Sequence, residues 1–332
     1  MASKLRRVAV TILMTALLPA AARRAVAQGV QPKPFQIGWL TGSSSTTYVE
    51  FLNAFREGLV ELGWTEGRQF VLLPRFADGH LERLAGLAAD LVDKNVDLIV
   101  ATTPPTLAAA RHATSQIPIV MVWGPDPAEA GVVASLARPG GNVTGLTSLS
   151  VDLSVKQLEL LRAMLPRGSS VAVMWNPANP WHSAALERIR SGETAGATLI
   201  TAVPVRVPED IDSAFEAMAK QRVGGLLCLS DPMTFNHRVR LADLAIKHRM
   251  PNMHGVTAYA DSGGLAAYWP NPKAMHRRAA TYSYRILNGA RPADLPIEQP
   301  TTFEFVINLK TARTLGIRVP SNVLARADRV IE

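Results

Sequence analysis

Five β-rich apolar runs in this chain end at small polar residues, and a helical pattern follows each of them. In an open parallel sheet, ligands bind outside the carboxyl ends of the strands, where loops expose backbone N–H groups and short side chains. Three of the runs lie in the first half of the chain and two in the second, at residues 36–40, 96–100, 117–122, 170–174 and 226–229. This distribution predicts two α/β lobes that face one ligand across a cleft.

Residues 1–27 have the pattern of a signal peptide rather than of a folded segment. Three basic residues precede the apolar run 8–18, and Ala25-Val26-Ala27 supplies a small-x-small cleavage site. The run is too short to span a bilayer, and no cysteine stands at the cleavage site for lipid attachment. We expect export by the Sec or the twin-arginine route, cleavage after Ala27, and a periplasmic protein without a membrane anchor.

Charge and cysteine content narrow the class of protein. The chain of 332 residues has a formal net charge of +8, but residues 1–27 hold five basic residues and no acidic one, which leaves about +3. This balance gives no indication of a nucleic-acid partner, and we expect none. The single cysteine, Cys228, lies in an apolar run and is interpreted as a small buried hydrophobe. The remaining length suits two domains.

The order of the predicted elements indicates that the chain crosses between the lobes. Residues 143–149 form an extended piece without a helix of its own. A long helical pattern at 273–288 and a proline-bounded extended segment at 296–302 then precede a strand at 303–307. We expect a first lobe of residues 35–146 and 270–298, a second lobe of residues 147–269 and 299–332, and hinges near 145–148, 268–270 and 296–302.

Several blocks of the sequence resemble one family. The most specific block is 133–145, with the sequence VASLARPGGNVTG, and others lie at 55–67, 97–104, 117–120, 293–312 and 324–332. The chain resembles the ABC transporter substrate-binding proteins related to tryptophan- and tyrosine-binding proteins, from about residue 35 to residue 332. The resemblance implies the type I periplasmic binding protein fold: two Rossmann-like lobes with parallel sheets, joined by three hinge crossings, which close around one small ligand.

Hydroxyl groups follow two predicted strands of the first lobe. Ser43 and Ser44 come after the first strand, and Thr102 and Thr103 come after the strand at 96–100. Together with the N–H groups at the helix N-termini, these hydroxyl groups can donate hydrogen bonds to the carboxylate of a ligand. They can instead simply cap the helices that they precede, and both roles can coexist. Thr41, Gly42 and Pro104 complete these two turns in the candidate ligand site.

Two carboxylates stand at matching strand ends, Asp126 in the first lobe and Asp231 in the second. Either can pair with the ammonium group of an amino acid or an amine. The alternative is that each begins a helix, because an Asp-Pro pair is an ordinary helix start. Asn176 has the same two interpretations, and Ser230 lies beside Asp231 in the candidate site.

Four tryptophans lie at or near predicted strand ends: Trp39, Trp123, Trp175 and Trp269. Together they can enclose a planar ligand or an organic cation. A tryptophan at a strand end more often packs under a helix, so we expect one or two of the four to line the cleft, with Trp123 in the candidate site. Tyr268 is expected to add a phenolic hydrogen bond.

The sequence gives little support for an enzyme. The sequence has no G-x-S-x-G elbow, Walker A loop or G-x-G-x-x-G turn, and no pair of its seven histidines has metal-ligand spacing on a helix. We expect no catalytic residue, no metal and no cofactor. His276, Arg277 and Arg278 are interpreted as the solvated face of the long helix.

The sequence therefore predicts a monomeric extracytoplasmic solute-binding protein of an ABC importer. It would deliver a small ligand, with an aromatic amino acid as the first candidate, to a permease and through it to the ATPase. One alternative is a sensing protein that presents its closed form to a sensor kinase, and another is a secreted α/β enzyme. Permease genes beside this gene favour transport, and a kinase gene favours sensing.

Overall fold

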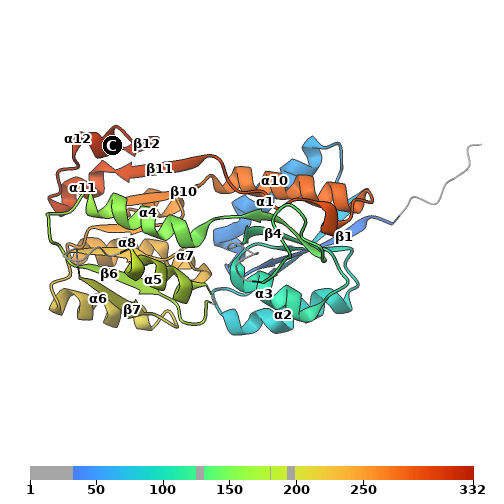
Figure 1. The fold of residues 1–332 in the computed structure, drawn as a ribbon, viewed down its shortest axis with the longest axis horizontal. Helices are drawn as coiled ribbons and strands as arrows, with labels where there is room; N and C mark the ends of the chain where they lie inside the picture. The colour runs from blue at the N-terminus through green and yellow to red at the C-terminus, as the bar shows by residue number, and fades with distance from the viewer. Residues whose placement is uncertain (1–32, 125–130, 180, 193–198) are drawn as a thin grey trace, which may run out of the picture. The chain divides into compact units, whose positions relative to one another are not determined.

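Two α/β lobes, each built on its own β-sheet, make up residues 34–332 in this computed structural model (Figure 1). The structure describes residues 33–124, 131–179, 181–192 and 199–332. The expected signal peptide, residues 1–27, and Asp126 lie outside the described residues. In the part of the chain that is described, none of the helices has the length and apolarity needed to cross a membrane.

The sheet of the first lobe is entirely parallel, in the order β2-β1-β3-β4-β5. Its strands are β1 (Phe35–Thr41), β2 (Phe70–Phe76), β3 (Leu98–Ala101), β4 (Ile119–Gly124) and β5 (Val143–Thr147). The chain moves to one side of β1 to form β2 and to the other side to form β3. The carboxyl ends of β1 and β3 therefore meet at a topological switch point, where an open parallel sheet forms a ligand crevice.

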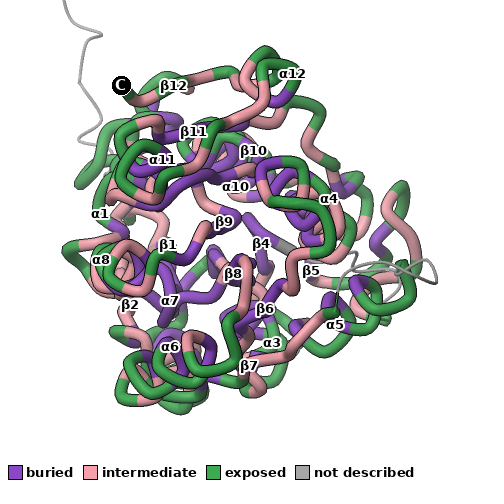
Figure 2. The backbone as a smooth tube through the Cα atoms, turned by 90° about the vertical axis from the view of Figure 1, so that its left-hand side faces the viewer, coloured by how far each residue is buried: buried purple, intermediate pink, exposed green. Residues whose placement is uncertain are grey.

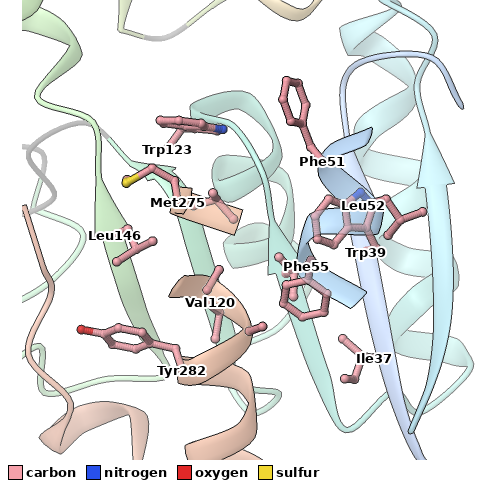
Figure 3. Packing of buried hydrophobic residues seen from close by; sticks show 14 of the residues in the cluster. Ile37, Trp39, Phe51, Leu52, Phe55, Val120, Trp123, Leu146, Met275 and Tyr282 are labelled. Atoms are coloured by element: carbon pink, nitrogen blue, oxygen red, sulfur yellow. The ribbon is translucent and has the colours of Figure 1, made fainter. Parts of the chain in front are cut away.

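Helices cover both faces of this sheet, which explains why its central strands are almost wholly apolar. Ile37 and Trp39 of β1 pack against α1 (Ser45–Glu61) and α10 (Pro272–Leu287). Leu40, which points to the opposite face, packs with α2 (Leu84–Asp93) and α3 (Pro104–Ala113). Figure 3 shows side chains of the first face, including Ile37 and Trp39, between the strands and helices α1 and α10.

The second sheet has the order β12-β11-β10-β9-β8-β6-β7. Its strands are β6 (Val171–Trp175), β7 (Ile200–Pro204), β8 (Gly225–Cys228), β9 (Asn252–His254), β10 (Ala266–Pro270), β11 (Phe303–Asn308) and β12 (Arg329–Ile331). The β7-β6-β8 part repeats the reversal of the first lobe, so a second switch point lies at the carboxyl ends of β6 and β8.

Longer helices also cover both faces of the second sheet. One face packs against α4 (Ser150–Arg162) and α5 (His182–Ser191), and the other against α6 (Asp210–Lys220) and α8 (Arg238–Lys247). Figure 2 shows the buried residues concentrated on the strands and the exposed ones on the outer turns of the helices. The shorter helices are η1 (Leu81–Arg83), α7 (Pro232–Asn236), α9 (Ala258–Asp261), η2 (Pro292–Asp294), α11 (Leu309–Leu315) and α12 (Ser321–Leu324).

The chain passes between the two sheets three times: between β5 and α4, between β10 and α10, and between η2 and β11. The expected two-lobed fold is thus confirmed. The first and third crossings are bonded to each other, because the Thr147 N–H donates to the Glu298 carbonyl at 2.9 Å and the Glu298 N–H donates to the Gly145 carbonyl at 3.0 Å. After α10 the chain re-enters the second sheet at the end where β10 left it, so β11 runs antiparallel to β10.

Candidate ligand-binding site

A cavity lies where the carboxyl ends of the two sheets face each other. Ser43 follows β1, Thr103 follows β3, and Ser230 and Asp231 follow β8, and all four side chains line it. The cavity has a volume of about 90 Å³. A single buried water needs roughly 10–15 Å³, so the cavity has room for more than one water. The reversal of strand order in each sheet brings these three turns together.

Aromatic side chains from both lobes form one wall of the cavity. Tyr48 and Phe51 project from α1, and Phe235 projects from α7 of the other lobe. The ring centroids of Tyr48 and Phe51 lie 4.8 Å apart, and that of Phe235 lies 6.0 Å from Phe51. The ring centroids of Trp123 and Trp269 lie 5.9 Å apart, with the two ring planes tilted by 47°. Figure 3 shows Phe51 and Trp123 at the same end of the packed cluster. Such a wall suits a flat apolar group.

His276 lies directly behind this wall. Its ring stacks on Phe51 at 5.2 Å with an interplanar angle of 9°, and it also contacts Trp123 at 5.7 Å. The side chain is completely buried, and Nδ1–H donates to the Pro272 carbonyl at 2.7 Å. Burial lowers the pKa of His276 to about 4, so the ring is neutral. The expectation that His276 belongs to the solvated face of α10 is wrong, because α1 and β4 cover it.

Arg277 and Arg278 do lie on the outer side of α10. Arg277 pairs with Glu57 and Glu61 of α1, and Arg278 pairs with Glu298 of the third crossing. At about 100° per residue, Arg277 lies about 100° and Arg278 about 160° around the helix from His276, so these three consecutive polar residues cannot all face solvent on a packed helix.

Asp231, which follows β8 of the second lobe, provides a buried carboxylate at the cavity. It accepts hydrogen bonds from Asn179 Nδ2 at 3.0 Å, Asn176 Nδ2 at 3.3 Å and the Met233 N–H at 2.9 Å. Both asparagine side chains direct their oxygens at backbone N–H groups of their own loop, so their amide groups must point at Asp231. A carboxylate has about four acceptor positions, and one therefore remains for a ligand donor.

His182 holds the loop that carries these asparagines. Its Nδ1 accepts from the Asn176 N–H at 2.9 Å, and its Nε2 lies 3.1 Å from the Ser230 carbonyl. A donor opposite one nitrogen and an acceptor opposite the other require the neutral ring protonated at Nε2. Burial lowers the pKa of His182, and the negative charge of Asp231 only partly opposes this shift. His182 therefore joins the turns after β6 and β8.

Three polar groups at the cavity have no hydrogen-bond partner within the described part of the chain: Ser43 Oγ, Ser230 Oγ and Trp181 Nε1. A buried polar group without a partner costs free energy, so these atoms mark positions where a ligand or water gains most by binding. Tyr48 adds a further hydroxyl to the wall. Burial raises the pKa of Tyr48, so this hydroxyl keeps its proton and can donate.

The cavity and the fold agree with the comparison to known families. The profile of the family described as ABC transporter substrate binding protein matches residues 44–331. The chain belongs to this family. Among curated proteins it is similar to a tyrosine-binding protein of Clostridioides difficile (strain R20291), with 24% identity over 265 residues, covering 80% of this chain and 76% of that protein. The expected relation to tryptophan- and tyrosine-binding proteins is thus confirmed.

Solved structures confirm the type I periplasmic binding protein fold. A conserved domain protein from Vibrio cholerae superposes with a TM-score of 0.83 at 26% identity, over 90% of this chain and 100% of that one. A domain from Streptococcus pneumonia in complex with L-Trp superposes with a TM-score of 0.81 at 24% identity, over the same shares. The family and the fold are therefore those of substrate-binding proteins of ABC transporters.

Six of the thirteen candidate site residues line the cavity of this family member: Ser43, Thr103, Pro104, Trp123, Ser230 and Asp231. Five others lie in the same turns without lining it. Thr41 is completely buried, the Thr102 hydroxyl donates to the Leu40 carbonyl at 3.1 Å, and Ser44 caps α1. Asn176 bonds to Asp231, and Gly42 packs against Pro232.

The remaining two candidates are not brought to the cavity by the described structure. The Tyr268 ring stacks on Phe303 at 5.6 Å and lines a separate surface hollow. Only its backbone turns toward the site, where its carbonyl accepts from Gln157 at 3.0 Å. The alternation of side chains along β10 is the reason, because Trp269 faces the cavity and its neighbour must face away. Asp126 lies outside the described residues.

Two of the four strand-end tryptophans, Trp123 and Trp269, line the cavity. Trp39 is completely buried under α1 and α10, and Trp175 packs against the core of the second lobe. Lining residues absent from the candidate set include Tyr48, Phe51, Gln157, Asn179, Trp181, His182, Phe235 and Trp269. The polar turn after β6, with the sequence NPANPWH, carries a signal for three of them, whereas Tyr48 and Phe51 look like ordinary members of an apolar helix stripe.

The described residues contain no group of three or more His, Cys, Asp or Glu side chains arranged to hold a metal ion. Cys228 is buried in the core of the second lobe, and burial raises the pKa of its thiol to about 12. A thiol with this pKa stays protonated, as expected for a residue with a packing role.

Proposed function

We propose that this chain is the solute receptor of an ABC importer and that it captures an aromatic amino acid between its lobes. The observation that carries the proposal is the buried carboxylate of Asp231 at one end of a cavity walled by aromatic rings. A charged acceptor and an apolar wall in one small space match a ligand with an ammonium group and a flat ring. The relatives that are named for tyrosine binding or hold L-Trp support the same ligand class.

The three parts of such a ligand each find a partner. The ammonium group pairs with Asp231, which lines the cavity and whose Oδ2 accepts from Asn179 alone among the described residues. The carboxylate accepts from the Ser43 hydroxyl and lies near the N-terminus of α3, where Thr103 and Pro104 line the cavity. The ring lies against Tyr48, Phe51 and Trp123. Trp181 Nε1 and Ser230 Oγ are further donors for oxygen atoms of the ligand.

Closure of the lobes accompanies binding in this proposal. The lobes are residues 35–146 with 270–298 and residues 147–269 with 299–332, and the hinges lie near 145–148, 268–270 and 296–302. The bonds between the Thr147 and Glu298 backbones tie two of the hinges into one flexing unit. The ligand gains affinity because its surface is buried by both lobes at once.

Export and delivery complete the proposal. The first 27 residues direct the chain to the periplasm and are removed after Ala27, and the mature protein acts as a monomer that presents its ligand to a permease coupled to an ATPase. The intact mass of the exported protein tests the cleavage site. A mass that includes residues 1–27 contradicts it.

A ligand panel tests the binding site itself. L-Tryptophan, L-tyrosine and L-phenylalanine should raise the melting temperature, because a ligand that binds only the folded state stabilises it. Tryptamine, which lacks the carboxylate, and 3-indolepropionate, which lacks the amine, should each bind more weakly than L-tryptophan in calorimetry. Indifference to all three amino acids rejects this ligand class.

A further inference from the structure

Asn236 joins the two lobes outside the cavity. It is the last residue of α7 in the second lobe, and its Oδ1 accepts from the Thr47 hydroxyl at 2.8 Å and from the Ser44 N–H at 3.2 Å. Ser44 and Thr47 belong to the first turn of α1 in the first lobe. The neighbouring Phe235 lines the cavity, whereas Asn236 does not. This contact therefore bridges the lobes without belonging to the cavity lining.

Two glycines of the first lobe permit this approach. A Cβ at Gly42 would lie 2.6 Å from Pro232 Cγ, and a Cβ at Gly79 would lie 3.1 Å from Asn236 Nδ2. Both glycines face α7, and because they have no side chain, α7 of the second lobe can pack directly against the backbone of the first lobe. Gly42 has no positive φ, and its need for a small residue comes from this contact. Gly42, a candidate for ligand contact, therefore packs against Pro232 of the other lobe and does not line the cavity.

The contact is formed only when the lobes lie together. Rotation about the three crossings moves α7 away from α1, and it breaks both hydrogen bonds to Asn236 Oδ1 and the packing of Pro232 on Gly42. The two bonds then stabilise the closed arrangement relative to the open one. A ligand held between the lobes leaves only after they open, so stabilising the closed arrangement slows its release.

We propose that Asn236, with Gly42, forms a latch between the lobes that slows ligand release without contacting the ligand. Asn236 is accordingly a positioning residue for closure. The identity of the retained ligand rests on the proposed function, whereas the latch itself is a contact between the lobes. Its effect is therefore measurable with and without an amino acid.

The decisive variant is Asn236→Ala in the full mature chain, with L-tyrosine as the probe. Because two interlobe hydrogen bonds are lost, we expect the dissociation rate, followed by the fluorescence of the cavity tryptophans, to rise about tenfold. The association rate should change much less. Without an amino acid, small-angle scattering should give a larger radius of gyration than for the wild-type protein.

Two further variants separate closure from general stability. Asn288→Ala removes an exposed asparagine whose side-chain amide donates to the Tyr284 carbonyl of its own helix, and it should change neither the dissociation rate nor the radius. Asn236→Asp keeps an acceptor oxygen for Ser44 and Thr47 near the N-terminus of α1, and it should preserve slow release. This variant also replaces Asn236 Nδ2, a buried donor without a partner among the described residues.

The outcomes distinguish the latch from the proposed function. If Asn236→Ala leaves the radius without amino acid and the dissociation rate of L-tyrosine equal to those of the wild-type protein, the latch is overturned. If L-tyrosine does not bind at all, the proposed ligand fails, and the radius of gyration alone then decides the latch. Equal radii for the wild-type and Asn236→Ala proteins in that case overturn it.

Discussion

Asp231 shows how one residue serves both the fold and the candidate site. Its carboxylate caps α7 through the Met233 N–H, and it fixes the amides of Asn176 and Asn179 across the turn after β6. The two interpretations drawn from the sequence, helix start and ligand partner, therefore do not compete. The same hydrogen bonds that build this turn hold the carboxylate in place at the cavity.

Substituting Asp231 by Ala should weaken L-tryptophan binding by about 1.5–3 kcal/mol, the range of a hydrogen bond to a charged group. This corresponds to a rise in Kd of roughly tenfold to 150-fold. Binding of 3-indolepropionate, which has no ammonium group, should change far less. Titration calorimetry measures both.

Asp210→Ala provides the matched control, because Asp210 accepts backbone N–H groups at the start of α6 outside the cavity. It should leave both affinities unchanged. Equal affinity of L-tryptophan for the Asp231→Ala and wild-type proteins would remove Asp231 from the ligand site.

At the scale of elements, α1 and α10 pack tightly against each other on the first sheet. They are separated by more than two hundred residues in sequence, yet a Cβ at Gly58 would lie 2.8 Å from Ala280 Cβ and 3.0 Å from the Arg277 carbonyl. The two backbones approach because neither helix has a bulky side chain at the crossing. This contact holds α10, which follows a strand of the second lobe, on the first lobe and behind the aromatic wall.

Gly58→Ala should therefore destabilise the protein, although alanine has the higher helix propensity. The clash with α10 should lower the free energy of unfolding by about 1–3 kcal/mol. A Cβ at Gly86, in α2, would meet no atom of the described residues within 4 Å. Gly86→Ala should raise the free energy of unfolding by about 0.4–1 kcal/mol. Urea unfolding measures both, and a stabilising Gly58→Ala would contradict the close helix contact.

At the scale of the whole molecule, three buried neutral histidines link folding to pH. Burial lowers the pKa of His276 to about 4 and that of His254 to about 3, and it also lowers the pKa of His182. Each ring takes up its proton near pH 6.5 in the unfolded chain. Between these values the unfolded state binds more protons than the folded state, so stability falls as the pH decreases from about 6.5 toward 4.

His276→Phe should reduce this pH dependence while it keeps the aromatic packing behind Phe51. From pH 7 to pH 5, the contribution of His276 alone to the loss of unfolding free energy is about 2 kcal/mol. Between pH 7 and pH 5, the free energy of unfolding of His276→Phe should therefore fall by about 2 kcal/mol less than that of the wild-type protein. Urea unfolding at the two pH values measures this difference. The control is His112→Gln, because His112 is exposed on α3. An unchanged pH dependence in His276→Phe would refute the assignment.

The local pattern of the sequence determined the elements and the location of the cleft. Strands such as residues 98–101 are apolar at every position, because both faces of the sheet are covered, and polar residues of the turns after β1, β3 and β8 line the cavity. The parallel order then places those turns at one edge of each sheet. Ser43, Thr103, Ser230 and Asp231 are predictable for this reason.

Only the tertiary structure decided which side chains meet at the cleft and which are covered. The periodicity of α1 marks Phe51 as buried, but it does not say that Phe235 of the other lobe lies opposite. His276 looks solvated beside two arginines until α1 packs over it, and Asn236 has no local feature that points to Ser44. Such contacts join segments about two hundred residues apart, and helical or strand periods report only on neighbours within a few residues.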